Sequence, residues 1–292
     1  MSSQCFKSAI GFSLLAYAIS LMIMIVLLTN CQLVEHPTTE QERSPAIQMD
    51  PSDPKAFYLD TREPETYRKR KIPDFSSFKD VKRKKQAFIS FLKPIIDEQN
   101  ALQIRRKIQL DALKQTHNAG KPFSKQGMKV LNDLLKTYRI PKDTKLDQAF
   151  EILETRVNTI PGSMVIAQAA SESAWGTSRF AKQAKNYFGQ WCFKEGCGIV
   201  PAKRGAGATH EIAKFQSVES SVRAYFKNLN TYKTYRDFRK LRLKATQNSQ
   251  PLTGLNLVEG LKHYSERGND YIEDLKSIIR FNQFDALFKE NR

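Results

Sequence analysis

Apolar residues recur at helical spacing in several stretches of the chain. The first stretch has the three- and four-residue steps of an amphipathic helix and contains Phe88, Phe91, Leu92, Ile95 and Ile96. Further helices are predicted at 124–138 and 146–157, because each pattern is followed by a break with proline, RIPKD or NTIPG. Another helix is predicted to start at Pro161 and to run through GSMVIAQAASES. The pattern therefore predicts a mainly α-helical protein.

One later stretch has the pattern of a β-strand. Residues 205–215, GAGATHEIAKF, follow a glycine-rich turn with residues that alternate between two sides. We expect a strand or hairpin arm here, and thus a small β-hairpin lobe in an otherwise helical protein.

The chain opens with an apolar run that is long enough to cross a bilayer. Ala9–Leu28 has 20 residues without a charge and follows Lys7. The run leads into LLTNC, where Cys31 stands as the lipidated cysteine does in bacterial lipoprotein signals, although Asn30 replaces the usual small residue. Residues 1–31 are thus an uncleaved anchor, a lipoprotein signal or a cleaved signal. Each alternative places the rest of the chain in the cell envelope, on the periplasmic side.

Composition changes along the next part of the chain. Residues 32–66 are rich in Pro, Thr, Glu and Asp, which suits a disordered tether. Residues 67–145 form a basic helical segment with two clusters, RKRK at 68–71 and KRKK at 82–85. These clusters are either a solvated helix face or a contact for anionic lipid or wall polymer.

The net charge of the chain indicates an anionic partner. Lys and Arg number 47 against 30 Asp and Glu, which gives +17, and 40% of the residues are hydrophobic, as in a globular protein. Nucleic acid, anionic lipid and cell-wall polymer would all fit this charge. Export makes nucleic acid the least suitable of the three.

An acid stands among small residues near the end of the helix that starts at Pro161. The segment AQAASESAWG places Glu172 in a run of Ala and Ser that lets other backbone approach closely. Such a glutamate can point to solvent or pair with a cation such as Arg179. Alternatively, the helix dipole and the apolar Trp175 raise its pKa, which suits a general acid that protonates the leaving oxygen of a glycosidic bond.

Several motifs in order extend this second interpretation. They are AQAASESAWGTSRFAKQAKNYFGQW, FQSVESSVRAYFKNLNT and YSERGNDYIEDLKSIIRFN. Together they resemble the bacterial glucosaminidase domains of glycoside hydrolase family 73, which belong to the lysozyme-like superfamily and cut peptidoglycan glycan strands. The resemblance implies a lysozyme-like α+β catalytic domain at 146–292, preceded by the N-terminal helices. It also implies an endo-β-N-acetylglucosaminidase that needs no cofactor, cleaves the β-1,4 bond between N-acetylglucosamine and N-acetylmuramic acid, and uses Glu172 as the catalytic acid.

The same resemblance suggests further residues of the site. Tyr264 corresponds to a tyrosine that lies near the catalytic acid in the family, where its hydroxyl could orient water or the N-acetyl group. Trp175, Tyr187 and Phe188 are candidates for substrate binding, because sugar rings stack on aromatic faces; core packing is the alternative for Tyr187 and Phe188. Tyr271 is expected in the core.

A second carboxylate is harder to choose. Glycosidases commonly use two carboxylates, which lie about 5–5.5 Å apart in retaining enzymes and about 6.5–9.5 Å apart in inverting enzymes. In substrate-assisted enzymes the N-acetyl group of the substrate replaces one of them. The candidates are Glu195, Glu211 and Glu219. Glu211 is favoured because its predicted strand lies beside the cleft, although it could face solvent. Glu219 fits the first turn of a helix, where it would complement the dipole.

Cysteine spacing agrees with an exported chain. Cys192 and Cys197 enclose FKEG, a tight loop that a disulfide could close. A zinc site is not expected, because no second ligand pair follows and His210 and His263 are isolated. The main alternative function is a catalytically inactive protein that keeps the lysozyme-like fold and binds the cell wall or acts as a scaffold.

Overall fold

The computed structural model describes residues 49–61, 70–201, 207 and 209–289. These described residues all belong to one compact unit. The apolar run at 9–28, Cys31 and most of the glycine-rich turn before Glu211 lie outside the described residues.

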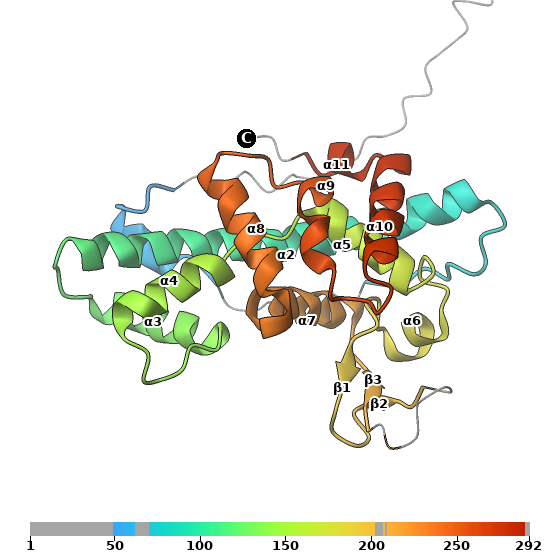
Figure 1. The fold of residues 1–292 in the computed structure, drawn as a ribbon, viewed down its shortest axis with the longest axis horizontal. Helices are drawn as coiled ribbons and strands as arrows, with labels where there is room; N and C mark the ends of the chain where they lie inside the picture. Colours follow the sequence, from blue (N-terminus) through green and yellow to red (C-terminus); the bar gives the residue numbers. More distant parts are fainter. Residues whose placement is uncertain (1–48, 62–69, 202–206, 208, 290–292) are drawn as a thin grey trace, which may run out of the picture. The chain divides into compact units, whose positions relative to one another are not determined.

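The helices predicted from the sequence are present (Figure 1). A long helix, α2 (Val81–Asn118), continues through Pro94 and is followed by α3 (Lys125–Thr137) and α4 (Leu146–Arg156). The chain then forms α5 (Gly162–Glu172) and the short α6 (Arg179–Ala184). The C-terminal part adds α7 (Val218–Thr231), α8 (Arg236–Gln247), α9 (Gly254–Leu257), α10 (Asn269–Phe281) and α11 (Phe284–Leu287), with short 3-10 turns between them. The protein is mainly helical, as expected.

Helix α5 lies at the centre of the larger core. Every residue from Gly162 to Ala170 is buried, and the helix contacts α2, α9, α10 and α11. Its many small side chains make these close approaches possible. At Gly162, for example, an added Cβ atom would lie 2.1 Å from the ring of Phe288. The sequence pattern thus positions a helix that is enclosed until its last turn, which ends at Glu172.

A second, smaller core lies at the other end of α2. Leu110 and Leu113 of α2 join residues of α3 and α4 there, including Leu131, Leu134 and Leu153. Phe88, Leu92 and Ile96, from the first half of α2, belong instead to the larger core with α5. One helix therefore contributes to both cores.

A small antiparallel sheet completes the α+β fold. Its strands are β1 (Trp191–Cys192), β2 (Gly198–Ile199) and β3 (Glu211–Ala213), in the order β1-β3-β2. Trp191 pairs with Ile212, and Cys192 pairs with Glu211. The described residues of 191–213, called the finger below, project beside α6 and α7 in Figure 1. The predicted strand is confirmed, but it is confined to three residues.

The tether predicted at 32–66 is partly folded. Residues 54–58 form a 3-10 helix with Ala56 fully buried against α2. Gln109 of α2 donates a hydrogen bond from Nε2 to the carbonyl oxygen of Leu59 at 3.0 Å, and Arg105 donates from Nε to that of Asp60 at 2.7 Å. The expectation of disorder is therefore wrong for residues 49–61, because the few apolar residues of this stretch pack against α2.

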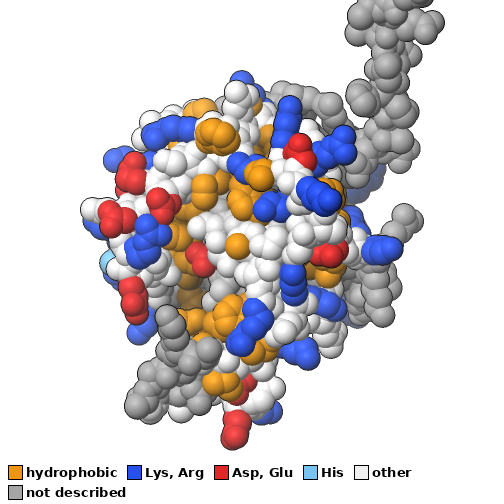
Figure 2. Space-filling view, turned by 90° about the vertical axis from the view of Figure 1, so that its right-hand side faces the viewer, with side chains coloured by type: hydrophobic (Ala, Val, Ile, Leu, Met, Phe, Trp, Pro, Cys, Tyr) orange, Lys and Arg blue, Asp and Glu red, His pale blue; other side chains and the backbone are white. Residues whose placement is uncertain are grey.

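None of the helices in the described part of the chain is both long enough and apolar enough to span a membrane. On the face drawn in Figure 2, Lys and Arg side chains are spread between hydrophobic patches and a smaller number of acids.

Candidate active site

Glu172 is the last residue of α5, and the backbone turns sharply directly after it. The hydroxyl of Ser173 accepts a hydrogen bond from the backbone N–H of Gly176 at 2.8 Å and donates one to the carbonyl oxygen of Ala169 at 2.5 Å. Ala174, Trp175 and Gly176 all have positive φ angles, of 49°, 56° and 80°. Gly176 is required here, since an added Cβ atom would lie 2.3 Å from the ring of Phe75. This turn separates α5 from α6, which Ser178 caps.

The surroundings of Glu172 favour its neutral form. Tyr271 donates a hydrogen bond from its hydroxyl to Oε1 of Glu172 at 2.8 Å. On the other side, a Cβ atom added to Gly189 would lie 3.2 Å from Oε2, so the glycine leaves room for the carboxyl group. Burial raises the pKa of Glu172, and the hydrogen bond from Tyr271 lowers it by a smaller amount. The net effect is a pKa above the ordinary glutamate value.

A directed chain of buried hydrogen bonds ends at this carboxyl group. Tyr225 donates from its hydroxyl to Oε1 of Gln168. Gln168 donates from Nε2 to the hydroxyl of Tyr271 at 2.9 Å. Because Gln168 occupies the acceptor side of that hydroxyl, Tyr271 directs its proton to Glu172. Three buried side chains therefore fix the orientation of the acid.

Sequence reasoning missed this chain. Tyr271 is in the core as expected, but its hydroxyl contact with Glu172 spans 99 positions and no local pattern reports it. Gln168 did carry a signal. It is a polar residue four positions before Glu172, and thus on the same face, in a helix that otherwise contains small and apolar residues. A fully buried glutamine requires partners, which Tyr225 and Tyr271 provide.

Tyr264 lies next to this chain, but its hydroxyl has another partner. It donates to the carbonyl oxygen of Phe188 at 2.7 Å, while its ring stacks on that of Tyr271 with centroids 5.8 Å apart and planes 2° apart. Tyr235 follows, with its ring centroid 5.9 Å from that of Tyr264. Burial and the charge of Glu172 raise the pKa of Tyr235 to about 12. Tyr271, Tyr264 and Tyr235 thus form a continuous row of ring contacts that begins at the hydrogen-bond partner of Glu172.

Two of the three aromatic residues expected to bind substrate belong to the packed interior, and the third, Trp175, is partly buried against it. Tyr187 and Phe188 are each 1% exposed, and their rings stack on Phe88 and Tyr225 respectively. Trp175 packs edge-on against Phe88, with ring centroids 5.4 Å apart, and also lies beside Phe284. In this conformation neither Tyr187 nor Phe188 offers a ring face to a sugar.

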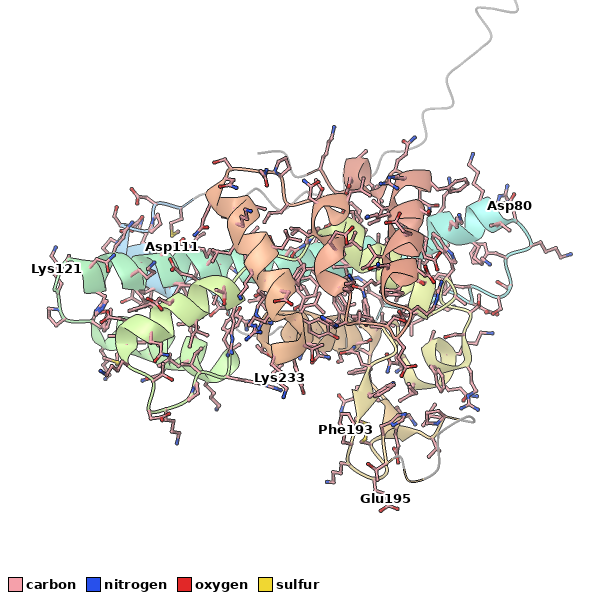
Figure 3. All side chains as sticks on the ribbon, in the orientation of Figure 1. Asp80, Asp111, Lys121, Phe193, Glu195 and Lys233 are labelled. Carbon is pink, nitrogen blue, oxygen red and sulfur yellow. A yellow bond between two sulfur atoms is a disulfide. The ribbon has the colours of Figure 1, made fainter. Side chains whose placement is uncertain are left out.

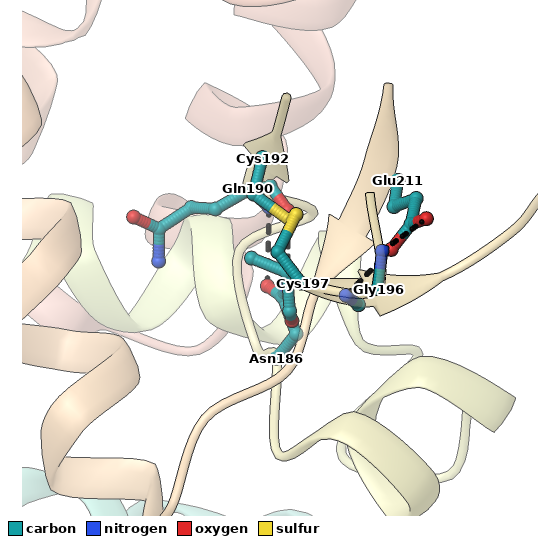
Figure 4. The surroundings of a disulfide bond; sticks show 8 residues. Asn186, Gln190, Cys192, Gly196, Cys197 and Glu211 are labelled. Carbon is teal, nitrogen blue, oxygen red and sulfur yellow. Dashed lines mark hydrogen bonds between the residues drawn. A yellow bond between two sulfur atoms is a disulfide. The ribbon is translucent and has the colours of Figure 1, made fainter. Parts of the chain in front are cut away.

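The candidate second carboxylates lie in different surroundings. Glu195 is exposed at the tip of the finger, where Figure 3 labels it. Glu211 is buried, and its two oxygens accept hydrogen bonds from the backbone N–H groups of Gly196 at 3.0 Å and Gly198 at 2.7 Å (Figure 4). Glu211 therefore supports the loop between β1 and β2.

Glu219 is buried in the first turn of α7, as the helix-start pattern predicted. One of its oxygens lies 3.7 Å from a guanidinium nitrogen of Arg70. Together with Arg70, Lys185 and neighbouring residues it lines a cavity of about 190 Å³. Neither Tyr271 nor Gly189, the two residues described above beside the Glu172 carboxyl group, lines this cavity.

The finger contains the expected disulfide between Cys192 and Cys197, shown in Figure 4. In the described part of the chain these sulfurs and the Glu211 carboxylate are close enough together to resemble a set of metal ligands. The disulfide removes both thiolates, however, and only one carboxylate remains as a ligand. This set therefore does not fit a metal ion.

Comparisons with known proteins match the region that holds the acid. The family model Glucosaminidase, described as mannosyl-glycoprotein endo-beta-N-acetylglucosaminidase, matches residues 147–284. Protein bax of Escherichia coli (strain K12) is 33% identical over 213 residues, which cover 73% of this chain and 74% of that protein. No solved structure matches the chain significantly. Glu172, Gln168, Tyr225 and Tyr271 all lie within the range that the family model matches.

Proposed function

Because the chain belongs to the glucosaminidase family of glycoside hydrolases, as a protein similar to bax, we propose that it hydrolyses peptidoglycan at the β-1,4 bond between N-acetylglucosamine and N-acetylmuramic acid. Glu172 is the general acid. The observation that carries this proposal is the half-buried carboxyl group at the end of α5, whose pKa is raised by burial and whose orientation is fixed by Tyr271.

The proposed step begins with protonated Glu172 at the bridging oxygen of the glycan. The acid donates its proton to that oxygen while the bond from the oxygen to the anomeric carbon breaks, and the bonding electrons leave with the oxygen. The positive charge that develops on the sugar is then captured by water, either directly or after attack by the N-acetyl group or a carboxylate. After an intermediate has formed, Glu172 is regenerated when it takes a proton back from the attacking water. When water attacks directly on the opposite face of the sugar ring, a separate base takes the proton of that water, and Glu172 is reprotonated from solvent.

Muropeptide analysis tests the reaction. Mass spectrometry of fragments released from purified peptidoglycan should show reducing-end N-acetylglucosamine and no reducing-end N-acetylmuramic acid. Fragments with the opposite reducing end would contradict the bond assignment. Absence of any fragments, with folded protein that still sediments with the wall, would favour the inactive wall-binding alternative.

Replacement of Tyr271 by phenylalanine is expected to shift the pH dependence of turnover. The hydroxyl lowers the pKa of Glu172, so its removal lets burial raise that pKa further. Glu172 then stays protonated to higher pH, and the alkaline limb of the pH–rate profile should shift to higher pH. The rate at the optimum should fall by about 10-fold, since the acid loses its orientation.

Tyr264→Phe is the matched control, because it removes a neighbouring hydroxyl that contacts the backbone oxygen of Phe188 rather than Glu172. Its alkaline limb should stay in place. If the limb moved in Tyr264→Phe and not in Tyr271→Phe, the family-based role of Tyr264 would be favoured and that of Tyr271 contradicted.

Replacement of Glu211 by glutamine separates a structural from a chemical role. The carboxylate accepts two backbone N–H groups, whereas glutamine would turn an NH₂ group toward one of them. We expect faster amide exchange at 196–199 and a rate reduction of a few-fold, about the effect of one lost hydrogen bond. Glu195→Gln, at the exposed tip, should change neither. A loss of turnover in Glu211→Gln with unchanged exchange would indicate that Glu211 takes part in catalysis.

The proposal extends to the N-terminal segment. We propose that residues 1–31 export the protein and hold it at the membrane, with Cys31 as the lipidation site if the signal is of the lipoprotein type. The basic clusters would then face the wall or lipid head groups. Protease treatment of spheroplasts should digest the catalytic part, and protection from protease would contradict a periplasmic location.

A further inference from the structure

The finger carries two exposed aromatic side chains. Trp191 in β1 is 55% exposed and Phe193 is 73% exposed, and Figure 3 labels Phe193 on the outer part of the finger. This exposure contrasts with that of Tyr187 and Phe188, which are enclosed in the core.

Trp191 is held in a defined orientation. Its ring stacks on His210, with centroids 4.1 Å apart and planes 17° apart. The register explains this contact, because Trp191 pairs with Ile212 and His210, two positions earlier, projects from the same face of the sheet. One ring face is therefore covered by His210, and the exposed part includes the opposite face.

The backbone around Trp191 is also fixed. Gln190 donates from Nε2 to the carbonyl oxygen of Ser221 at 3.0 Å and accepts from Asn228 at 2.9 Å, which attaches this point to α7. On the other side, the disulfide at Cys192 closes the β1–β2 loop. A side chain that is rigid before binding loses little conformational entropy when a ligand stacks on it.

Trp191 is two positions after Gly189, the residue that adjoins the carboxyl group of Glu172. Two residues span at most about 7 Å of extended chain. The Trp191 backbone therefore lies within one or two sugar lengths of the proposed proton donor.

We propose that Trp191 is a stacking platform for a pyranose ring of the glycan strand, adjacent to the bond that Glu172 cleaves; this rests on the proposed function. A β-linked N-acetylhexosamine presents its ring C–H groups on one face, and stacking on the indole removes apolar surface of both partners from water. His210 supports the ring from behind, so Trp191 binds sugar through its outer face.

The first test is kinetic. Trp191→Ala should raise KM for uncross-linked glycan strands by about 10-fold and lower kcat much less, because a subsite contact of this kind binds ground state and transition state alike. Trp191→Phe should restore most of the affinity. The control is Phe193→Ala, which removes a more exposed ring farther along the finger and should leave KM unchanged. Unaltered KM in Trp191→Ala would overturn the proposal.

The second test measures binding without turnover. The chain has 2 tryptophans, and Trp175 is partly buried against the larger core. Titration of Glu172→Gln protein with chitotriose should change the fluorescence saturably and protect it from acrylamide quenching. Both effects should vanish when Trp191→Phe is added. A response that survives this substitution would contradict the assignment.

The two tests also separate this inference from the proposed function. If the wild-type protein released no muropeptides but chitotriose still changed the fluorescence of Trp191, sugar binding at Trp191 would be supported and the catalytic proposal would fail. If the protein were active, but Trp191→Ala left KM unchanged and chitotriose left the fluorescence unchanged, the role of Trp191 would be wrong and the catalytic proposal would be unaffected.

Discussion

Replacement of Glu172 by glutamine is expected to lower the rate of peptidoglycan hydrolysis by about 10²- to 10⁴-fold, the contribution of a general acid. Glutamine keeps the shape of the side chain and still accepts the hydrogen bond from Tyr271, but it has no acidic proton to donate. The measurement is the release of reducing ends from the same peptidoglycan preparation under identical conditions. Wild-type turnover in a folded Glu172→Gln protein would remove Glu172 from the mechanism.

The same variant should be more stable than the wild type at neutral pH. Because burial raises the pKa of Glu172 above the ordinary glutamate value, the native state holds its proton at pH values where the unfolded chain has already released it. Stability therefore falls as pH rises through this window. Glutamine cannot ionise, so the loss is absent in the variant. Melting temperatures of the two proteins should differ at pH 7 and converge below pH 4.

This pairing of results is specific for a desolvated acid. A general loss of fold would lower activity and melting temperature together. A variant with lower activity and an equal or higher melting temperature shows that the wild type retains a destabilising group because the reaction needs it.

Replacement of Arg242 by methionine is expected to lower the free energy of unfolding by about 3–5 kcal/mol, because three acceptor oxygens lose their donor and each unsatisfied buried group costs about 1–3 kcal/mol. The Arg242 side chain of α8 is fully buried. It donates to the carbonyl oxygens of Thr155 at 2.9 Å and Thr159 at 2.8 Å, and to Oδ1 of Asn230 at 2.8 Å. These groups lie at the end of α4, in the linker before α5 and in α7, so one guanidinium group joins three segments.

Two further variants check this explanation. Arg242→Lys keeps a cation but has no planar fork that reaches several carbonyl groups, so most of the loss should persist. Lys240→Met, at an exposed position of the same helix, should change stability by less than about 0.5 kcal/mol. Urea denaturation of the three variants and the wild type gives the comparison. Equal stabilities for Arg242→Met and Lys240→Met would contradict the role of Arg242.

Local patterns were sufficient for three of the helices. Spacing of apolar residues and proline breaks placed α3, α4 and α5 to within a residue or two, because these helices have amphipathic or small-residue faces and clear ends. The path of α2 through Pro94 and the docking of 49–61 on it were not predictable from such patterns. Both depend on surfaces that distant residues provide.

The site was predictable only where a motif marks it. Glu172 stands in such a motif, but its hydrogen-bond partner Tyr271 is reached through the fold. Aromatic residues gave the least reliable guide: Tyr187 is enclosed and Trp191 is exposed, although they stand in the same short segment. Sequence identifies an aromatic residue equally well in a core and on a surface, and only packing distinguishes the two.

The long helix α2 has a consequence for how this protein is divided. The family model matches residues 147–284 and so leaves out all of α2, yet Phe88, Leu92 and Ile96 of α2 lie in one core with the helix that carries Glu172. A chain cut at the start of the match would expose that side of the core to water. The range of the family model is therefore smaller than the segment that folds, and a fragment cut to that range would lack part of its own core.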